Sequence, residues 1–227
     1  MPKISVPNCG AAGVFKDLSV AELPLGGWTD ASNIRFLDGY LSPFLGHGQV
    51  YNSPAFAPQF VMPVNVGATR YWLYATASKQ FVVANSGGVT THTDITHLTA
   101  RAGVVNAWSG FVFGGIPVLN VGDTSKVPMY WNQNLTNKFL DLPAWPANIY
   151  ARVLRQYKNF IVALGITKSG VSYPFMIKWS SPAVPGALPS TWNEADATND
   201  AGEFDIAEGQ DPVIDGLGLK NSFIVYK

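Results

Sequence analysis

The chain reads Tyr157-Lys158-Asn159-Phe160-Ile161-Val162 at residues 157–162, and related phrases occur on either side. A related phrase, WSGFVF, occupies residues 108–113, and a version one residue longer, LKNSFIV, occupies residues 219–225. In each copy a Gly or Asn leads into a run of aromatic and β-branched residues, which is the pattern of a turn followed by a strand. The repeated unit is therefore predicted to be a β-hairpin, and the chain to be all-β.

The copies are spaced in the manner of propeller blades. Gly110 and Asn159 stand 49 residues apart (159 − 110), within the roughly 40 to 50 residues that a propeller blade takes. Asn159 and Asn221 stand 62 apart (221 − 159), and a Pro-rich, acidic stretch before the third copy matches the excess. A weaker, earlier unit joins residues 71–75 to residues 81–84. Three hairpins and a last strand do not close a ring of about four to eight blades. We therefore predict an incomplete or open β-propeller-type repeat, completed by something outside residues 1–227.

Composition divides the chain into an arm and a repeat domain. Residues 1–55 lack the hairpin phrase and are predicted to be an extended N-terminal arm. Within it we expect short strands at 33–37 and 49–51, a type I′ turn at Asp38-Gly39 and one helical turn from Ser19 to Leu23. Residues 56–227 are predicted to form the propeller-like domain, which includes a Pro-rich acidic insertion at 182–212.

Inside the repeat domain the strand pattern predicts two pairs, residues 111–119 with 129–131 and residues 159–166 with 175–179. The second member of each pair ends in a tryptophan, Trp131 or Trp179, which we expect to pack in the core. Phe160 and Phe223 are expected to be core residues as well, because each opens the aromatic run of its hairpin phrase.

Charge and cysteine content exclude several classes of protein. Hydrophobic residues make up 47% of the 227-residue chain, whereas charged residues make up 13% and sum to zero. A binder that grips nucleic acid through phosphates needs clustered Lys and Arg, so this class is not favoured. Cys9 is the single cysteine and cannot form an intrachain disulfide. No run of about 20 apolar residues predicts a membrane helix. Low charge with many aromatic residues favours a subunit of an assembly.

The acidic insertion is the candidate interaction site. Its carboxylates include Glu194, Asp196, Asp200, Glu203 and Asp205, and the sequence has no basic residue between Lys178 and Lys220. A calcium loop is one alternative, but the spacing of the carboxylates does not follow the EF-hand pattern. We therefore expect a solvated or partner-facing loop that serves contact rather than chemistry, with no metal bound.

The sequence does not favour catalysis. His47, His92 and His97 lack the spacing of a zinc site and the carboxylate partner of a catalytic site, and they are expected to be surface or turn residues. Nucleophile-elbow, phosphate-loop and dinucleotide motifs do not occur. The Ser190-Thr191-Trp192 segment resembles the end of a sialidase Asp-box, but it occurs once and without the Asp. We therefore expect neither an enzyme nor a cofactor.

Several segments resemble the start of tail hub or nozzle proteins of short-tailed bacteriophages. They are GVFKDLS at 13–19, ELP at 22–24, WTDASNIRF at 28–36, Asp38-Gly39 and GHG at 46–48, followed later by WSSP at 179–182. The resemblance implies a virion structural protein, assembled in the host cytoplasm, that forms a ring, commonly sixfold. This ring would extend the portal–adaptor ring, contact tail spikes, fibres or a needle, and let genome DNA pass without sequence-specific binding.

Two other classes are weighed against this reading. One is a carbohydrate-binding or glycan-processing propeller, and the other is a cellular propeller scaffold. Glycan processing needs carboxylates that converge at the centre of the propeller. Because the acidic residues gather in one insertion, the sequence favours the structural protein.

Overall fold

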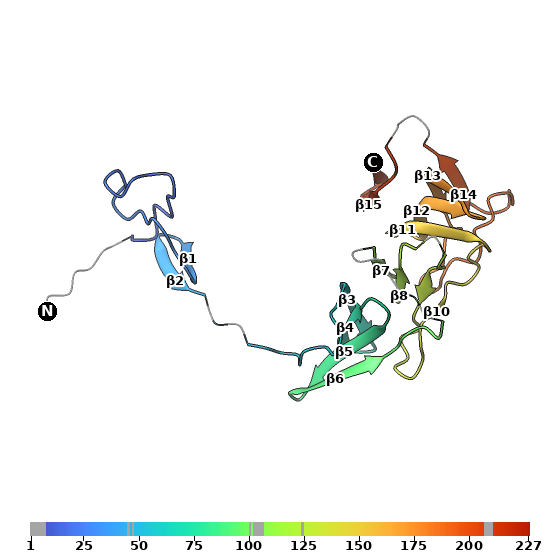
Figure 1. Ribbon diagram of the computed structural model, residues 1–227, viewed down its shortest axis with the longest axis horizontal. Coiled ribbons are helices and arrows are strands. Elements are labelled where there is room, and N and C mark those ends of the chain that lie inside the picture. Colours follow the sequence, from blue (N-terminus) through green and yellow to red (C-terminus); the bar gives the residue numbers. More distant parts are fainter. Residues whose placement is uncertain are drawn as a thin grey trace. The chain divides into compact units, whose positions relative to one another are not determined.

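The computed structural model describes residues 8–44, 46, 48–99, 101, 107–123, 125–206 and 211–227. The described residues form strands, turns and irregular segments, so the all-β prediction is confirmed (Figure 1). Within this part of the chain no helix is long and apolar enough to cross a membrane. Two compact units divide between Gln49 and Val50, six residues before the boundary expected from composition.

The first unit contains one hairpin, β1 (Ile34–Leu37) paired with β2 (Tyr40–Pro43). Asp38 and Gly39 both have positive φ, 49° and 81°, which a type I′ turn requires, as predicted. At Ser19 the chain makes a single hydrogen-bonded turn, in which the Ser19 hydroxyl donates to the Glu22 carboxylate at 3.0 Å. The strand expected at 49–51 does not form.

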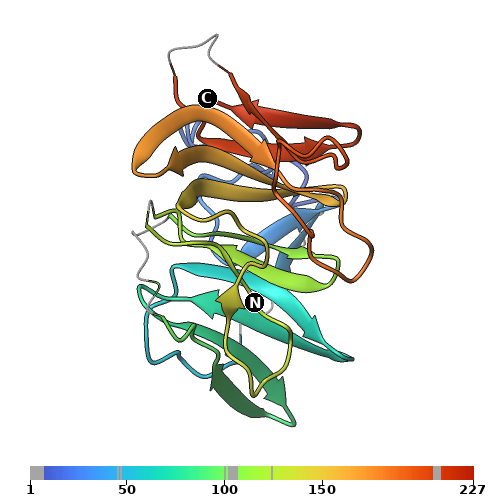
Figure 2. The same cartoon turned by 90° about the vertical axis from the view of Figure 1, so that its right-hand side faces the viewer.

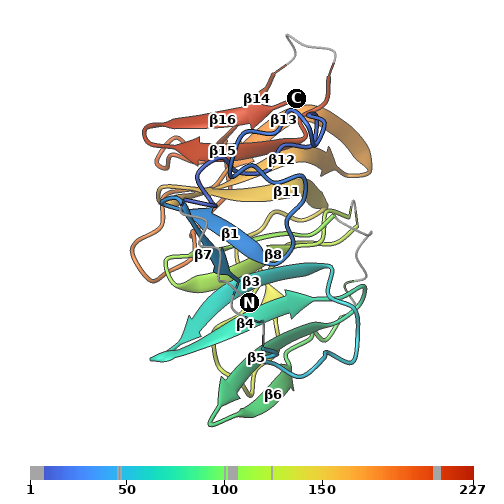
Figure 3. The same ribbon diagram turned by 90° about the vertical axis from the view of Figure 1, so that its left-hand side faces the viewer.

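The second unit contains four antiparallel sheets in chain order, none of them closed, and in each sheet sequence neighbours are hydrogen-bonded neighbours (Figures 2 and 3). The first sheet holds β3 (Phe60–Val66), β4 (Thr69–Ala75), β5 (Gln80–Ser86) and β6 (Val89–Asp94). The second holds β7 (Ser109–Phe113), β8 (Ile116–Asn120), β9 (Met129–Tyr130) and β10 (Leu140–Asp141). The third holds β11 (Ile149–Tyr157), β12 (Phe160–Lys168), β13 (Val171–Trp179) and β14 (Gly202–Asp205). The fourth holds two strands, β15 (Asp215–Leu219) and β16 (Ser222–Tyr226).

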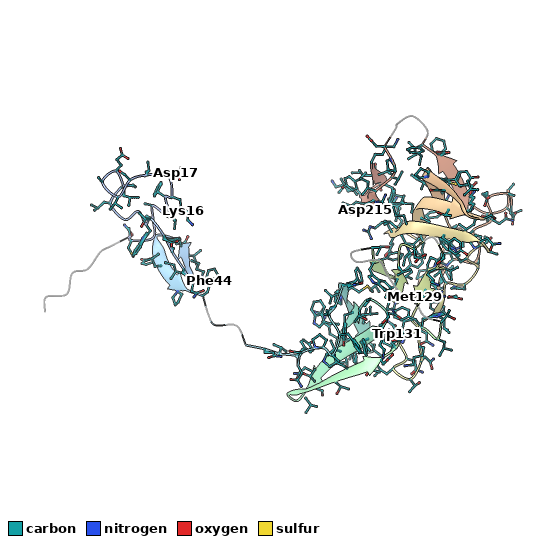
Figure 4. All side chains as sticks on the ribbon, in the orientation of Figure 1. Lys16, Asp17, Phe44, Met129, Trp131 and Asp215 are labelled. Atoms are coloured by element: carbon teal, nitrogen blue, oxygen red, sulfur yellow. The ribbon has the colours of Figure 1, made fainter. Side chains whose placement is uncertain are left out.

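Consecutive sheets pack face to face, and each interface is an apolar layer. Leu73 and Val82 of the first sheet pack with Met129 and Trp131, which are labelled in Figure 4. A second layer joins the second and third sheets, and a third, smaller layer joins the third sheet to the hairpin β15–β16. The first strands β3, β7, β11 and β15 contact one another in succession. Strand β3 alternates between exposed and buried residues, whereas β8 and β12 are buried along most of their length, because the sheets that hold these two strands have neighbours on both faces.

The structure corrects the alignment of the repeat. The first turn of each sheet begins at Gly67, Gly114, Lys158 and Lys220, all with positive φ, and these positions stand 47, 44 and 62 residues apart. Gly110, which the sequence aligned with Asn159, lies inside β7 instead. A Cβ on Gly110 would come within 2.5 Å of the Leu119 side chain, so this glycine allows close packing and does not mark a turn.

This correction also changes the predicted strand pairs. Residues 111–119 form two strands separated by the turn at 114–115, and β8 is the strand that pairs with β9. The second predicted pair is confirmed, because Val162 of β12 pairs with Trp179 of β13. Trp131 is fully buried, as expected of a packing residue. Phe160 and Phe223 are half-buried and line a cavity, so the expectation of full core positions was wrong for both.

Candidate functional site

The acidic segment is part loop and part strand. After β13 the chain leaves the third sheet, and it returns as β14, whose register places Glu203 opposite Lys178. Residues 202–205 are therefore the fourth strand of this sheet, and the loop itself precedes them. This return brings carboxylates of the segment to lysines of β12 and β13 that are distant in sequence.

A buried lysine joins two of the predicted site residues. The side chain of Lys178 is 1% exposed, and its ammonium contacts Glu194 and lies 3.2 Å from Glu203 Oε2. Glu203 also accepts from Lys168 Nζ at 2.5 Å. Lys178 is buried because it lies in phase with Met176 of β13 and with Ser180, which directly follows the strand, and all three are buried. Two lysines and two carboxylates thus form one network at the edge of the third sheet.

This network shifts the titration of Glu194. Burial by itself would raise the pKa of Glu194, but the hydrogen bond and positive charge of Lys178 outweigh it and hold the pKa below its ordinary value. Lys178 is enclosed and paired, which suits a structural cation better than a nucleophile. The segment itself contains no basic residue, and the cations that reach Glu194 and Glu203 are Lys168 and Lys178, which lie outside it.

The other predicted residues do not join the network. Asp196 accepts from the backbone N–H and the hydroxyl of Thr198 at 2.9 and 2.6 Å, and these bonds lower its pKa. The backbone oxygen of Asp200 accepts from the Trp179 indole at 2.8 Å, and Asp205 is exposed at the end of β14. Across the described ranges no group of three His, Cys, Asp or Glu side chains could hold a metal ion. The interaction role of the exposed carboxylates stays a prediction.

Sequence reasoning missed the lysines, although one signal was present. Lys178 stands between Ile177 and Trp179 in a strand of alternating pattern, in phase with Met176. A lysine in phase with a buried residue must find a carboxylate, since an unpaired buried charge is costly. The sequence does not say which carboxylate, because the pairing depends on the path of the loop.

The histidines are structural in a different way from that expected. His97 is buried, and its Nδ1 accepts from the Thr99 N–H at 3.0 Å while its Nε2 faces Asp141 at 3.2 Å. Arg101, also buried, contacts the same carboxylate. The expectation of a surface residue was therefore wrong for His97. His92 bonds the Tyr74 hydroxyl at 2.8 Å, and His47 lies outside the described residues.

An apolar cavity of about 420 Å³ lies between the third sheet and the hairpin β15–β16. Its walls are mainly the side chains of Tyr157, Phe160, Val162, Ile177, Trp179 and Phe223, with Asp200 at the margin. Such a lining suits apolar side chains and offers few hydrogen-bonding groups. The buried charges therefore serve the fold, and the cavity is the stronger candidate for binding.

Comparison of the sequence with protein-family models and with curated proteins returns no match.

Proposed function

We propose that the chain is a virion structural protein, a subunit of a tail nozzle or hub ring of a short-tailed bacteriophage. The ring would extend the portal–adaptor ring, contact spikes, fibres or a needle, and let the genome pass during ejection. Support comes from the resemblance carried by residues 13–48 and by the WSSP segment at 179–182. The hairpin β1–β2, with its turn at Asp38-Gly39, falls within the first of these stretches.

The observation that carries this proposal is the run of antiparallel meanders in the second unit. The first strands β3, β7, β11 and β15 contact one another, and the first turns of the three four-stranded sheets recur at 47 and 44 residues. Blades of a β-propeller repeat every 40 to 50 residues or so. We propose that the four sheets are blades arranged about the side on which these first strands lie.

Charge distribution supports a passive channel. The chain is neutral overall, and several of its cations are already paired, among them Arg101 with Asp141, Lys138 with Asp94, and Arg155 with Asp215. Each Lys or Arg that contacted a phosphate would add salt-dependent affinity for DNA and slow its transit. A conduit is better served by cations that are held by carboxylates of the same chain.

A glycan-binding propeller is the second candidate, because aromatic rings line the cavity. Sugars stack on aromatic faces but also need several placed polar groups. Here Asp200 is the one acidic residue in the lining, beside four aromatic residues and two aliphatic ones. This composition favours apolar peptide side chains over a sugar. Screening the full chain on a glycan array distinguishes the two, since selective binding with turnover would replace the nozzle proposal.

Immunogold electron microscopy tests the nozzle proposal directly. Antibodies raised against the full chain should label short-tailed particles of the phage that encodes it. The label should lie at the tail vertex and at no other vertex of the capsid. Label spread over the capsid, or particles that remain unlabelled while the chain is found free in the lysate, would refute the assignment. An electrophoretic shift assay with duplex DNA at about 50 mM salt is expected to show no complex, because few phosphates would be neutralised.

A further inference from the structure

The third strands of the second and third sheets each pack against the preceding sheet. Met129 of β9 packs in the layer against the first sheet, and Met176 of β13 packs in the layer against the second. Tyr130 of β9 is covered in turn, since it packs against the layer that holds Met176. A third strand is thus a regular part of every interface between four-stranded sheets in this unit.

The third sheet presents the same surface to the fourth, but two strands meet it there. Tyr130 pairs with Val118 in the second sheet, and Trp179 pairs with Val162 in the third. The two aromatic residues occupy corresponding third-strand positions. Whereas Tyr130 lies against the third sheet, Trp179 and Ile177 line the apolar cavity beside β16. The cavity therefore lies where a third strand would follow β16.

Strand β16 has a free edge and an uncharged sequence. It pairs with β15 on one side, and along the described chain no strand pairs with its other side. Edge strands normally carry charged residues or proline, which block pairing with other chains. The edge strand β14 carries Glu203 and Asp205, but β16, Ser222–Tyr226, contains neither a charge nor a proline. An uncharged edge beside an apolar cavity is an open template for strand addition.

We propose that the edge of β16 and the adjoining cavity are a docking site for an antiparallel β-hairpin carried outside residues 1–227. The first strand of this partner pairs with β16 and directs apolar, uncharged side chains at alternating positions into the cavity against Ile177 and Trp179. Its second strand brings the sheet to the four strands of the other three. The inference does not depend on the phage assignment, since it follows from the sheets alone.

The first sheet supplies a suitable probe. Residues 76–94 follow the second strand β4 directly and contain β5 and β6. Phe81 and Val83 of β5 project to the face away from the second sheet, because they belong to a different cluster from Val82. In a third strand added to β16, that face would meet the cavity. Fusing a second copy of residues 76–94 after Lys227 of the full chain presents this hairpin at an effective concentration near the millimolar range.

Amide hydrogen exchange of residues 222–226 is the readout. We expect exchange in the fusion to be at least tenfold slower than in the full chain, because added strand pairing protects edge amides. A matched fusion with Phe81→Asp and Val83→Asp in the appended copy should lose this protection. Ile177→Lys in the cavity should also abolish it, whereas Ile224→Lys on the opposite face should leave it in place.

Three results would overturn the inference. Exchange at β16 that is equal in fusion and full chain would show that the edge does not accept a strand. Equal protection in the aspartate control would show that the cavity does not select apolar side chains. Protection of β16 in the unfused chain that rises with protein concentration would show that a second copy, and not a partner hairpin, occupies the edge. None of these results depends on whether antibodies against the chain label a phage tail.

Discussion

Replacing Glu194 and Glu203 together by glutamine leaves Lys178 as a buried cation without a carboxylate. The Lys178 side chain is 1% exposed, so its charge cannot regain water without local unfolding. Breaking a buried ion pair in this way costs about 3 to 5 kcal/mol of unfolding free energy. The reverse change, Lys178→Met, leaves carboxylates that are 39% and 23% exposed, and Glu203 keeps Lys168. We expect this change to cost about 1.5 to 3 kcal/mol, the contribution of a hydrogen bond to a charged group.

Urea unfolding followed by tryptophan fluorescence at pH 7 and fixed salt measures these costs, provided that the slope stays constant. The triple variant with Lys178→Met, Glu194→Gln and Glu203→Gln should recover most of the loss, because no unpaired charge remains. Asp205→Asn, on the same strand but exposed, serves as the control and should leave the midpoint unchanged. If the double variant is no less stable than this control, or the triple is no more stable than the double, the argument from a buried lysine is wrong.

Other variants test the packing between sheets and the ion pairs. Asp215, labelled in Figure 4, accepts two hydrogen bonds of 2.8 Å from Arg155 of β11. Asp215→Asn should speed amide exchange in β15–β16 several-fold while leaving exchange in the first sheet unchanged. An equal change in exchange rate in all sheets would contradict an anchoring role for this ion pair. Trp131→Ala should cost about 3 to 5 kcal/mol in urea unfolding, since Trp131 is fully buried; a loss under about 1 kcal/mol would place this ring outside the core. The lowered pKa of Glu194 adds stability above its unfolded value of 4.5 that is lost as pH falls through the folded value; the parent should lose stability more steeply than Glu194→Gln below about pH 4.5, and parallel pH profiles would refute the shift.

Local sequence signals predicted the fold where a particular backbone conformation requires a particular residue type. Asp38-Gly39 predicted its hairpin because positive φ is required at both positions of that turn. The repeat was visible for a similar reason, since Lys158 and Lys220 begin turns before aromatic runs. Its alignment failed at Gly110, because a glycine that permits a close approach looks the same in sequence as a glycine that permits a turn.

The candidate site was less accessible to sequence reasoning, because it depends on contacts across the third sheet. Glu203 meets Lys178 through the register of β13 and β14, and 25 residues separate the two in the chain. Charge counting within the acidic segment therefore found no cation and predicted solvated carboxylates. Likewise, the aromatic residues of the cavity could be named as strand residues, but their exposure follows from the number of strands in the neighbouring sheet.

The ion-pair network reduces the number of carboxylates in the acidic segment whose charge is available to a partner. Glu194 and Glu203 are paired with Lys178 and Lys168 of the third sheet, so most of their charge is neutralised within the chain. Asp200 and Asp205 are exposed. A steering role, in which fixed charges speed association with a basic surface, depends on charges that are not neutralised internally. If the segment contacts a neighbouring tail component, the carboxylates available to it include Asp200, Asp205 and Asp196, whose side chain accepts from the neutral Thr198. The two glutamates, paired with lysines, anchor the segment to the third sheet.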